Sequence, residues 1–239
     1  LVAKALNELM KDGYIINNGY APSSGGRRPL TYSLKADKMF ILAVAMDQLF
    51  TRIAMVDLLN NYVSPVETID WQLPNNDQAA AYLIKAVNNY ITKAGIKKSK
   101  IIGAGLGMPG FVNARKGINY SYLQNGHETL QQNLEQHIGL PVYIDNDSSL
   151  IALAELKFGL ARDKENVMVV NIGWGIGLGM IINGELFRGH TGYAGEFSHI
   201  PIFDSDILCE CGKRGCLETE ASLLVVAKNA RKKISEGKV

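Results

Sequence analysis

The apolar run FILAVAM at residues 40–46 predicts a buried strand, and FTRIAMVD at residues 50–57 predicts a second. A third strand is expected at 62–69, and helical periodicity without glycine follows at 78–92. Beyond it, strands are expected at 101–106, 142–144, 167–172 and 178–182, and helices at 129–137 and 148–158, the last capped by its serines. Three strands followed by alternating helices and strands predict an α/β layered fold of the ribonuclease H-like kind, in which two lobes enclose a cleft.

The composition is that of an ordinary globular protein. The chain has 239 residues, of which 47% are apolar and 20% charged, and its net charge is +2. A near-neutral total excludes a polyanion binder that uses the whole chain, but a local basic face remains open. The longest uncharged stretch, residues 166–184, is 19 residues long but holds five glycines and three asparagines, which predicts a glycine-rich hairpin and not a membrane helix. With three clustered cysteines and no recognisable signal peptide, we expect a cytoplasmic protein without membrane contact.

The first forty residues carry the excess positive charge, with six basic and three acidic side chains. Helical spacing at 2–10 is followed by Gly13, and short strands are expected at 14–16 and 30–34 around a loop at 17–29. A helix followed by a hairpin with Arg27 and Arg28 near its tip predicts the end of a winged helix-turn-helix, with further helices expected upstream. Lys4 and the two arginines would then contact DNA. A small packing appendage with solvated charges is the alternative.

Four potential metal ligands lie close together in the sequence, namely His199, Cys209, Cys211 and Cys216. Three thiolates and one imidazole complete a tetrahedral shell, which is the composition of a structural zinc site. Glycines at 212 and 215 allow the tight turn that would bring Cys211 and Cys216 onto one ion. We therefore expect structural Zn²⁺ as a cofactor. Three unrelated buried cysteines are the alternative.

Two nearby segments, GEFSHI at residues 195–200 and CECGKRGCLE at residues 209–218, carry a family resemblance. They closely resemble the signature of the ROK family (repressors, open reading frames and sugar kinases), and the chain resembles its winged-helix repressors of the N-acetylglucosamine and xylose type. The resemblance implies a partial winged helix-turn-helix at 1–38, a first ribonuclease H-like lobe at 39–145 and an incomplete second lobe with the zinc site at 146–239. It also implies a sugar pocket in the cleft, formed by Gly110, Asn146, Asp147, Glu196, His199 and Glu218.

These site residues have plainer alternatives. Asp147 could instead cap a helix at the end of a strand, and Glu196 and Glu218 could be solvated charges. Carboxylates and amides nevertheless suit a polyol, because each accepts or donates several directed hydrogen bonds.

The residues that would face ATP depart from the pattern of the family's kinases. Where those kinases have an Asp-x-Gly-Gly-Thr turn, this chain has Leu49 and Phe50 in place of the two glycines. In the second phosphate loop, at 173–179, Trp174 stands where the kinases have a threonine. Bulky side chains at these positions are expected to block the nucleotide phosphates, so we expect neither ATP–Mg²⁺ binding nor enzyme activity.

The resemblance therefore favours a sugar-responsive transcriptional repressor. Its expected partners are operator DNA and a small-molecule sugar or amino sugar. A homo-oligomer, either a dimer or a tetramer, is expected because winged helix-turn-helix motifs read paired half-sites. One alternative is an ATP-dependent sugar kinase of the glucokinase or N-acetylhexosamine kinase type, with Asp147 as the catalytic base. Another is a zinc-containing sugar-binding protein without a role at DNA.

Overall fold

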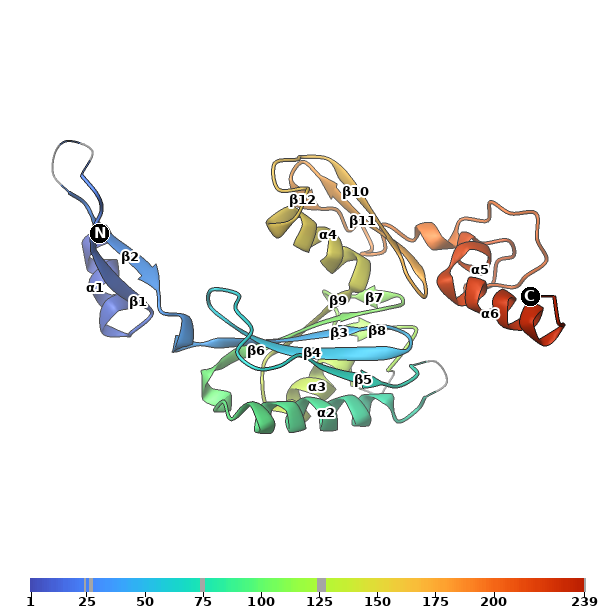
Figure 1. Cartoon of the computed structure of the whole chain (residues 1–239), viewed down its shortest axis with the longest axis horizontal. Helices are drawn as coiled ribbons and strands as arrows, with labels where there is room; N and C mark the ends of the chain where they lie inside the picture. The colour runs from blue at the N-terminus through green and yellow to red at the C-terminus, as the bar shows by residue number, and fades with distance from the viewer. Residues whose placement is uncertain (24, 26–27, 74–75, 124–127, 239) are drawn as a thin grey trace.

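The N-terminal elements form an arm at one side of the molecule (Figure 1). The computed structural model describes residues 1–23, 25, 28–73, 76–123 and 128–238. Helix α1 (Val2–Lys11) packs against β1 (Ile15–Tyr20), which pairs antiparallel with β2 (Leu30–Leu34). The strand expected at 14–16 is therefore longer than predicted. It runs into the expected loop through a bulge between Asn17 and Gly19, where Gly19 takes a φ of 83°.

The predicted strands at 40–46 and 50–57 are confirmed residue for residue as β3 (Phe40–Met46) and β4 (Phe50–Asp57). They belong to a five-stranded sheet with the order β5-β4-β3-β6-β9. The other members are β5 (Glu67–Asp70), β6 (Ile101–Met108) and β9 (Val142–Asn146). The pairs β3–β4 and β4–β5 are antiparallel, whereas β3–β6 and β6–β9 are parallel. An antiparallel trio continued by two parallel strands agrees with the expected ribonuclease H-like arrangement.

Helices α2 (Ala79–Ala94) and α3 (Leu130–Ile138) lie on the same side of this sheet (Figure 1). Both end at a left-handed glycine, Gly95 and Gly139, and Thr129 caps the start of α3 through a capping box. Alternate residues of β3 are buried against these helices, so the core lies on one face of the sheet. Its central residues include Leu42, Val44, Leu83, Val87, Leu106 and Leu134.

A second sheet forms the other lobe, with β10 (Val167–Ile172), β11 (Ile176–Ile182) and β12 (Glu185–Leu186) in antiparallel order. Helix α4 (Asp147–Phe158) packs on it. The contact is close because β11 presents glycines to the helix. A Cβ on Gly177 would overlap the side chain of Ser148, and one on Gly179 would overlap Ala152 and the Ser148 carbonyl.

The remaining elements connect or extend these layers. Helices α5 and α6 lie beside the loop that carries the cysteines (Figure 1). The bounds are β7 (Val112–Asn113), β8 (Ile118–Asn119), α5 (Leu217–Ala221), α6 (Leu223–Ser235) and the short 3₁₀ turns η1 (Ala36–Lys38), η2 (Lys98–Lys100) and η3 (Phe197–His199). No helix within the described residues is both long enough and apolar enough to span a bilayer.

Two local expectations are wrong. The strand expected at 62–69 is reduced to β5 and an isolated bridge between Tyr62 and Val56. Pro65 lies between these two pairings and has no N–H to donate to a sheet. The start of α4 is capped by Asn146 and not by the helix's serines, since Asn146 Oδ1 accepts the N–H of Ser149 at 3.1 Å.

Candidate functional site

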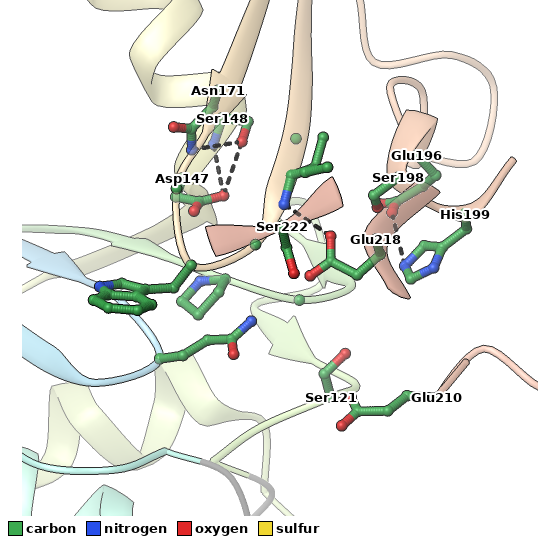
Figure 2. Close-up of a pocket in the computed structure, with 18 of the residues that line it drawn as sticks. Ser121, Asp147, Ser148, Asn171, Glu196, Ser198, His199, Glu210, Glu218 and Ser222 are labelled. Atoms are coloured by element: carbon green, nitrogen blue, oxygen red, sulfur yellow. Dashed lines mark hydrogen bonds and ion pairs between the residues drawn. The ribbon is translucent and has the colours of Figure 1, made fainter. Parts of the chain in front are cut away.

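A cavity of about 720 Å³ is lined by residues from both sheets and from α5 and α6. Figure 2 shows Asp147 on one side of it and Glu196, His199 and Glu218 on the other. The structure thus brings together residues that are far apart in the sequence. All six residues that the family resemblance assigns to a sugar pocket line this cavity: Gly110, Asn146, Asp147, Glu196, His199 and Glu218.

Two of these residues, Asn146 and Asp147, reach the cavity because β9 ends where α4 begins. Asn146 is the N-cap, and its Nδ2 also donates to the carbonyl of Gly110 at 3.3 Å. Asp147 is the first helical residue, so the alternative in which Asp147 itself is the N-cap does not hold. Its Oδ1 accepts the N–H of Ser148 at 2.7 Å and the Ser148 hydroxyl at 3.2 Å. The Asp147 carboxylate is therefore held in one orientation.

Five carboxyl groups line the cavity together with one lysine, Lys228; they belong to Asp47, Asp147, Glu196, Glu210 and Glu218. Burial raises the pKa of Asp147, with the charge of Asp47 adding to the effect. Burial also raises the pKa of Glu196 to about 7, again with a contribution from Asp147. The pKa of Glu218 is raised by burial and by the nearby charges of Glu210 and Asp147. None of these carboxyl groups forms an ion pair with a lysine or arginine of the described residues. With five carboxyl groups and one lysine, such a lining can hydrogen-bond a neutral polyol and disfavours anions.

Glu218 also contacts the glycine-rich turn between β10 and β11. Its Oε2 accepts the N–H of Ile176 at 2.8 Å, which is the dashed line at Glu218 in Figure 2. Its Oε1 lies 3.0 Å from where a Cβ on Gly175 would be. Gln48 Nε2 lies 3.4 Å from the same point, so the β3–β4 turn approaches this turn. Phosphate loops bind through free backbone N–H groups. Here one such N–H is already bonded to a carboxylate, which would repel a phosphate.

The obstruction expected from Leu49 and Phe50 needs correction. The β3–β4 turn closes without glycine, since the N–H of Asp47 donates to the carbonyl of Phe50 at 2.8 Å. Neither Leu49 nor Phe50 has a positive φ, and neither lines the cavity. The Phe50 ring instead lies 4.7 Å from the Arg52 guanidinium. Gln48 lines the cavity in their place, as does Trp174, which was expected there.

The four predicted metal ligands meet at one point, with the ligand atoms of His199, Cys209, Cys211 and Cys216 all within 4.8 Å of one another. Cys209 Sγ lies 3.4 Å from His199 Nδ1, and Cys211 Sγ lies 3.6 Å from Cys216 Sγ. Tetrahedral zinc with bonds of about 2.3 Å to sulfur separates its sulfur ligands by about 3.8 Å. The cluster therefore has the composition and the spacing of a metal site.

His199 joins this cluster to the cavity. Its Nδ1 faces Cys209, and its Nε2 lies 3.9 Å from Glu196 Oε2 (Figure 2). Burial lowers the pKa of His199, and the charge of Lys213 adds to the effect, which favours the neutral imidazole that binds metals. Phe111 from the first lobe stacks on the His199 ring, with centroids 5.2 Å apart.

Gly110, beside Phe111, has a structural reason to be glycine. Its φ is 91°, and a Cβ there would lie 2.6 Å from the Cβ of Ser121. Any larger residue would displace this part of the cavity wall.

The predicted DNA-binding residues lie on the N-terminal arm. Lys4 is exposed on α1, and Arg28 is exposed between β1 and β2. Arg27 lies outside the described residues. The arm is attached to the first lobe near η1, where the N–H of Leu58 donates to the carbonyl of Ala36 at 3.3 Å.

Several residues of the site escape sequence reasoning. Gln48 follows Asp47 in a turn that the resemblance already associates with phosphate, so its place beside the cavity could have been suspected. Asn171 Nδ2 donates to Ser148 Oγ at 3.3 Å. The position of Asn171 in its strand could have pointed to it. Residues 167, 169 and 171 of β10 are less exposed than 168, 170 and 172, so Asn171 is a polar residue on the less exposed side of the strand. For Arg188, which pairs with Asp145, the sequence gives no signal.

Known proteins resemble the chain along its whole length. It is 31% identical over 242 residues to the xylose repressor of Caldicellulosiruptor bescii, covering 99% of this chain and 60% of the repressor. It is 35% identical over 181 residues to the glucokinase of Halalkalibacterium halodurans, covering 72% of this chain and 55% of the glucokinase. A solved ROK family transcriptional regulator, described as a homologue of the E. coli MLC protein, matches with a TM-score of 0.75 at 24% identity, covering 100% of this chain and 61% of the regulator.

The match to that regulator confirms the expected two-lobed fold, which is ribonuclease H-like and of the actin-like ATPase type. The chain spans 60% and 55% of the two curated relatives named above. The model of the ROK family matches residues 52–238. The chain therefore belongs to the ROK family.

Proposed function

We propose that this protein is a sugar-responsive transcriptional repressor. The cavity binds the inducer, an uncharged sugar or an amino sugar, and the N-terminal arm binds operator DNA. One observation carries the proposal most directly: carboxyl and amide side chains gather around the cavity, while Glu218 occupies the backbone N–H of Ile176 that a phosphate would need. The similarity to a xylose repressor over 99% of the chain supports the same function.

The sugar would be held from both lobes. Asn146 and Asp147 supply an amide and a carboxylate from the start of α4, and Glu196, His199 and Glu218 face them across the cavity. Because Gly110 belongs to the first lobe and the other five residues to the second, a bound sugar favours the arrangement in which both lobes reach it. The ligand can shift the lobes only as far as its affinity for the two arrangements differs.

The proposal includes a structural zinc ion held by His199, Cys209, Cys211 and Cys216. When bound, the ion would supply no chemistry to a reaction but would fix the loop. His199 Nδ1 faces the cluster, and Nε2 faces Glu196 at 3.9 Å, so the loop places both residues at the cavity.

The proposed domains are a DNA-binding arm at 1–38, a first lobe at 39–145 and a second lobe at 146–239, acting as a dimer or tetramer on paired half-sites. Lys4 and Arg28 would contact phosphates, since both are exposed on the arm.

Fluorescence anisotropy with a labelled duplex from the region upstream of the protein's own gene tests this function. We expect binding that weakens when the inducer sugar is added. Arg28→Ala should weaken DNA binding, whereas Lys100→Ala, a change of an exposed lysine on the first lobe, should not. Asp147→Asn should bind DNA but lose the response to sugar. DNA binding that no sugar alters would contradict the proposal.

A second candidate function is an ATP-dependent sugar kinase, supported by the similarity to a glucokinase over 72% of the chain and by the raised pKa of the buried Asp147, which suits a proton acceptor. It predicts ATP-dependent phosphorylation of a sugar that Asp147→Asn abolishes. The absence of turnover with a panel of hexoses and hexosamines would exclude it.

A further inference from the structure

Arg188 links the second lobe to the strand that delivers the proposed sugar ligands. It follows β12 in the second lobe, where the N–H of Phe187 donates to the carbonyl of Met180 on β11 at 2.8 Å. Its guanidinium reaches Asp145 on β9 of the first sheet, with Nη1 2.7 Å from Oδ1 and Nη2 2.5 Å from Oδ2. Among the ion pairs of the described residues, this pair joins the two sheets.

The geometry of this pair sets it apart from a surface salt bridge. Each of the two terminal guanidinium nitrogens donates to a different carboxylate oxygen. The Arg188 side chain is only 31% exposed and that of Asp145 only 11%. The paired arrangement needs the planar fork of arginine, which lysine lacks. Removing one partner would leave the other charge partly buried without compensation.

Asp145 connects Arg188 to residues that line the cavity. Besides binding Arg188, its Oδ1 accepts the N–H of the next residue, Asn146, at 2.9 Å. Asn146 in turn caps α4 through Ser149 and bonds to the carbonyl of Gly110. The orientation of Asn146, and of Asp147 after it, therefore depends on a carboxylate that Arg188 holds.

Arg188 also begins the segment that leads to the opposite wall of the cavity. Its carbonyl accepts the N–H of Ala194 at 3.1 Å, which closes the loop of residues 188–194. Glu196 follows two residues later and lines the cavity. One side chain thus connects the two walls that would contact the sugar.

We propose that Arg188 is a positioning residue for sugar binding, which aligns the Asn146–Asp147 wall with the Glu196 wall by its paired contact with Asp145. This role rests on the proposed function of the cavity. Arg188 does not line the cavity and acts on the sugar through Asp145.

The test measures sugar binding to the whole chain by calorimetry, with D-xylose, D-glucose, D-glucosamine and N-acetyl-D-glucosamine as probes. Arg188→Ala and Asp145→Asn should each weaken binding of the preferred probe on the order of tenfold. The double variant should be no weaker than the weaker single variant, because both changes remove one interaction. Arg162→Ala is the matched control, since Arg162 is an exposed arginine of the second lobe that forms no ion pair with another described residue.

Chemical rescue with guanidinium distinguishes a positioning role of Arg188 from a loss of folding in the variant. Guanidinium chloride, far below its denaturing range, should restore affinity to Arg188→Ala but not to the variant that also carries Asp145→Asn. Bound metal and far-UV circular dichroism should match the wild type. Additive effects of the two changes, wild-type affinity in Arg188→Ala, or equal rescue of both variants would overturn the inference while leaving the proposed function intact. If the wild type binds none of the probes, the proposed function fails and Arg188 has no such role.

Discussion

Replacing Gly179 by alanine should destabilise the second lobe. A Cβ at this position would overlap the Ala152 side chain and the Ser148 carbonyl of α4, far inside the usual contact distance of about 3.5–4.0 Å between carbon atoms. Neither neighbour can rotate away, because one is a backbone oxygen and the other a methyl group. Helix α4 must therefore move off the sheet. Overpacking of this kind costs about 1–3 kcal/mol, and the lower entropy of the unfolded alanine chain returns about 0.4–1 kcal/mol. We expect a net loss of about 1–2 kcal/mol.

Gly105→Ala is the matched control. Gly105 lies in β6 outside the left-handed region, and a Cβ there would meet no atom within 4 Å. This variant should be neutral or slightly stabilised. Urea unfolding measures both variants, and the midpoint should fall for Gly179→Ala at an unchanged slope. Equal stability of the two variants would refute the packing explanation for the glycine run. The retained glycines of residues 173–179 would then again suggest a phosphate loop.

Three further outcomes are expected. The purified protein should carry one zinc ion per chain by elemental analysis. Cys216→Ser or a strong chelator should remove this ion and lower Tm. A protein that is equally stable without the metal would contradict the proposed zinc site. Glucose 6-phosphate should bind at least about tenfold more weakly than glucose by calorimetry, because the carboxylates of the lining repel its phosphate. Two unit charges roughly 8 Å apart repel each other by about 2 kcal/mol at an effective dielectric constant of 20. Equal affinities would show that the acidic lining does not select against anions. Burial raises the folded-state pKa of Asp147 above its unfolded value, so its ionisation costs stability as pH rises through that folded pKa. Asp147→Asn should therefore raise Tm at pH 7 but not below the ordinary carboxyl pKa, and a lower Tm at pH 7 would show that the charged form is not penalised.

The fold was largely predictable because its strands are long and apolar. The runs at 40–46 and 50–57 gave the correct bounds, since a buried strand leaves an uninterrupted signal. The expected strand at 62–69 failed where Pro65 interrupts the pairing, although the residues beside it favour strand. The sequence alone misplaces the N-cap of α4, because asparagine and serine both cap helices and only the hydrogen bond from the Ser149 N–H to Asn146 Oδ1 decides between them.

The site was predictable where its residues lie in short local motifs. The metal ligands and the Glu196–His199 pair fall within one segment, so a family signature names them together. Gln48 and Arg188 belong to no such motif. They meet the cavity or its supporting strand only through packing between distant segments, which a single sequence does not reveal. The glycines of β11 show that one sequence pattern can have two causes. Their pattern is associated with phosphate binding, but here close packing against α4 also requires them.

Whether the cavity takes a sugar or a nucleotide is the central question, and a thermal-shift screen of the purified chain answers it most directly. Each sugar is tested alone and with ATP–Mg²⁺. A ligand at 100 times its Kd stabilises the fold by about 2.7 kcal/mol, which is a readable shift in Tm. We expect one sugar to stabilise the protein, Asp147→Asn to lose that shift, and ATP–Mg²⁺ to add nothing. A clear shift with ATP–Mg²⁺ would contradict the expectation that Glu218, Gln48 and Trp174, which line the cavity, keep the nucleotide phosphates out of it.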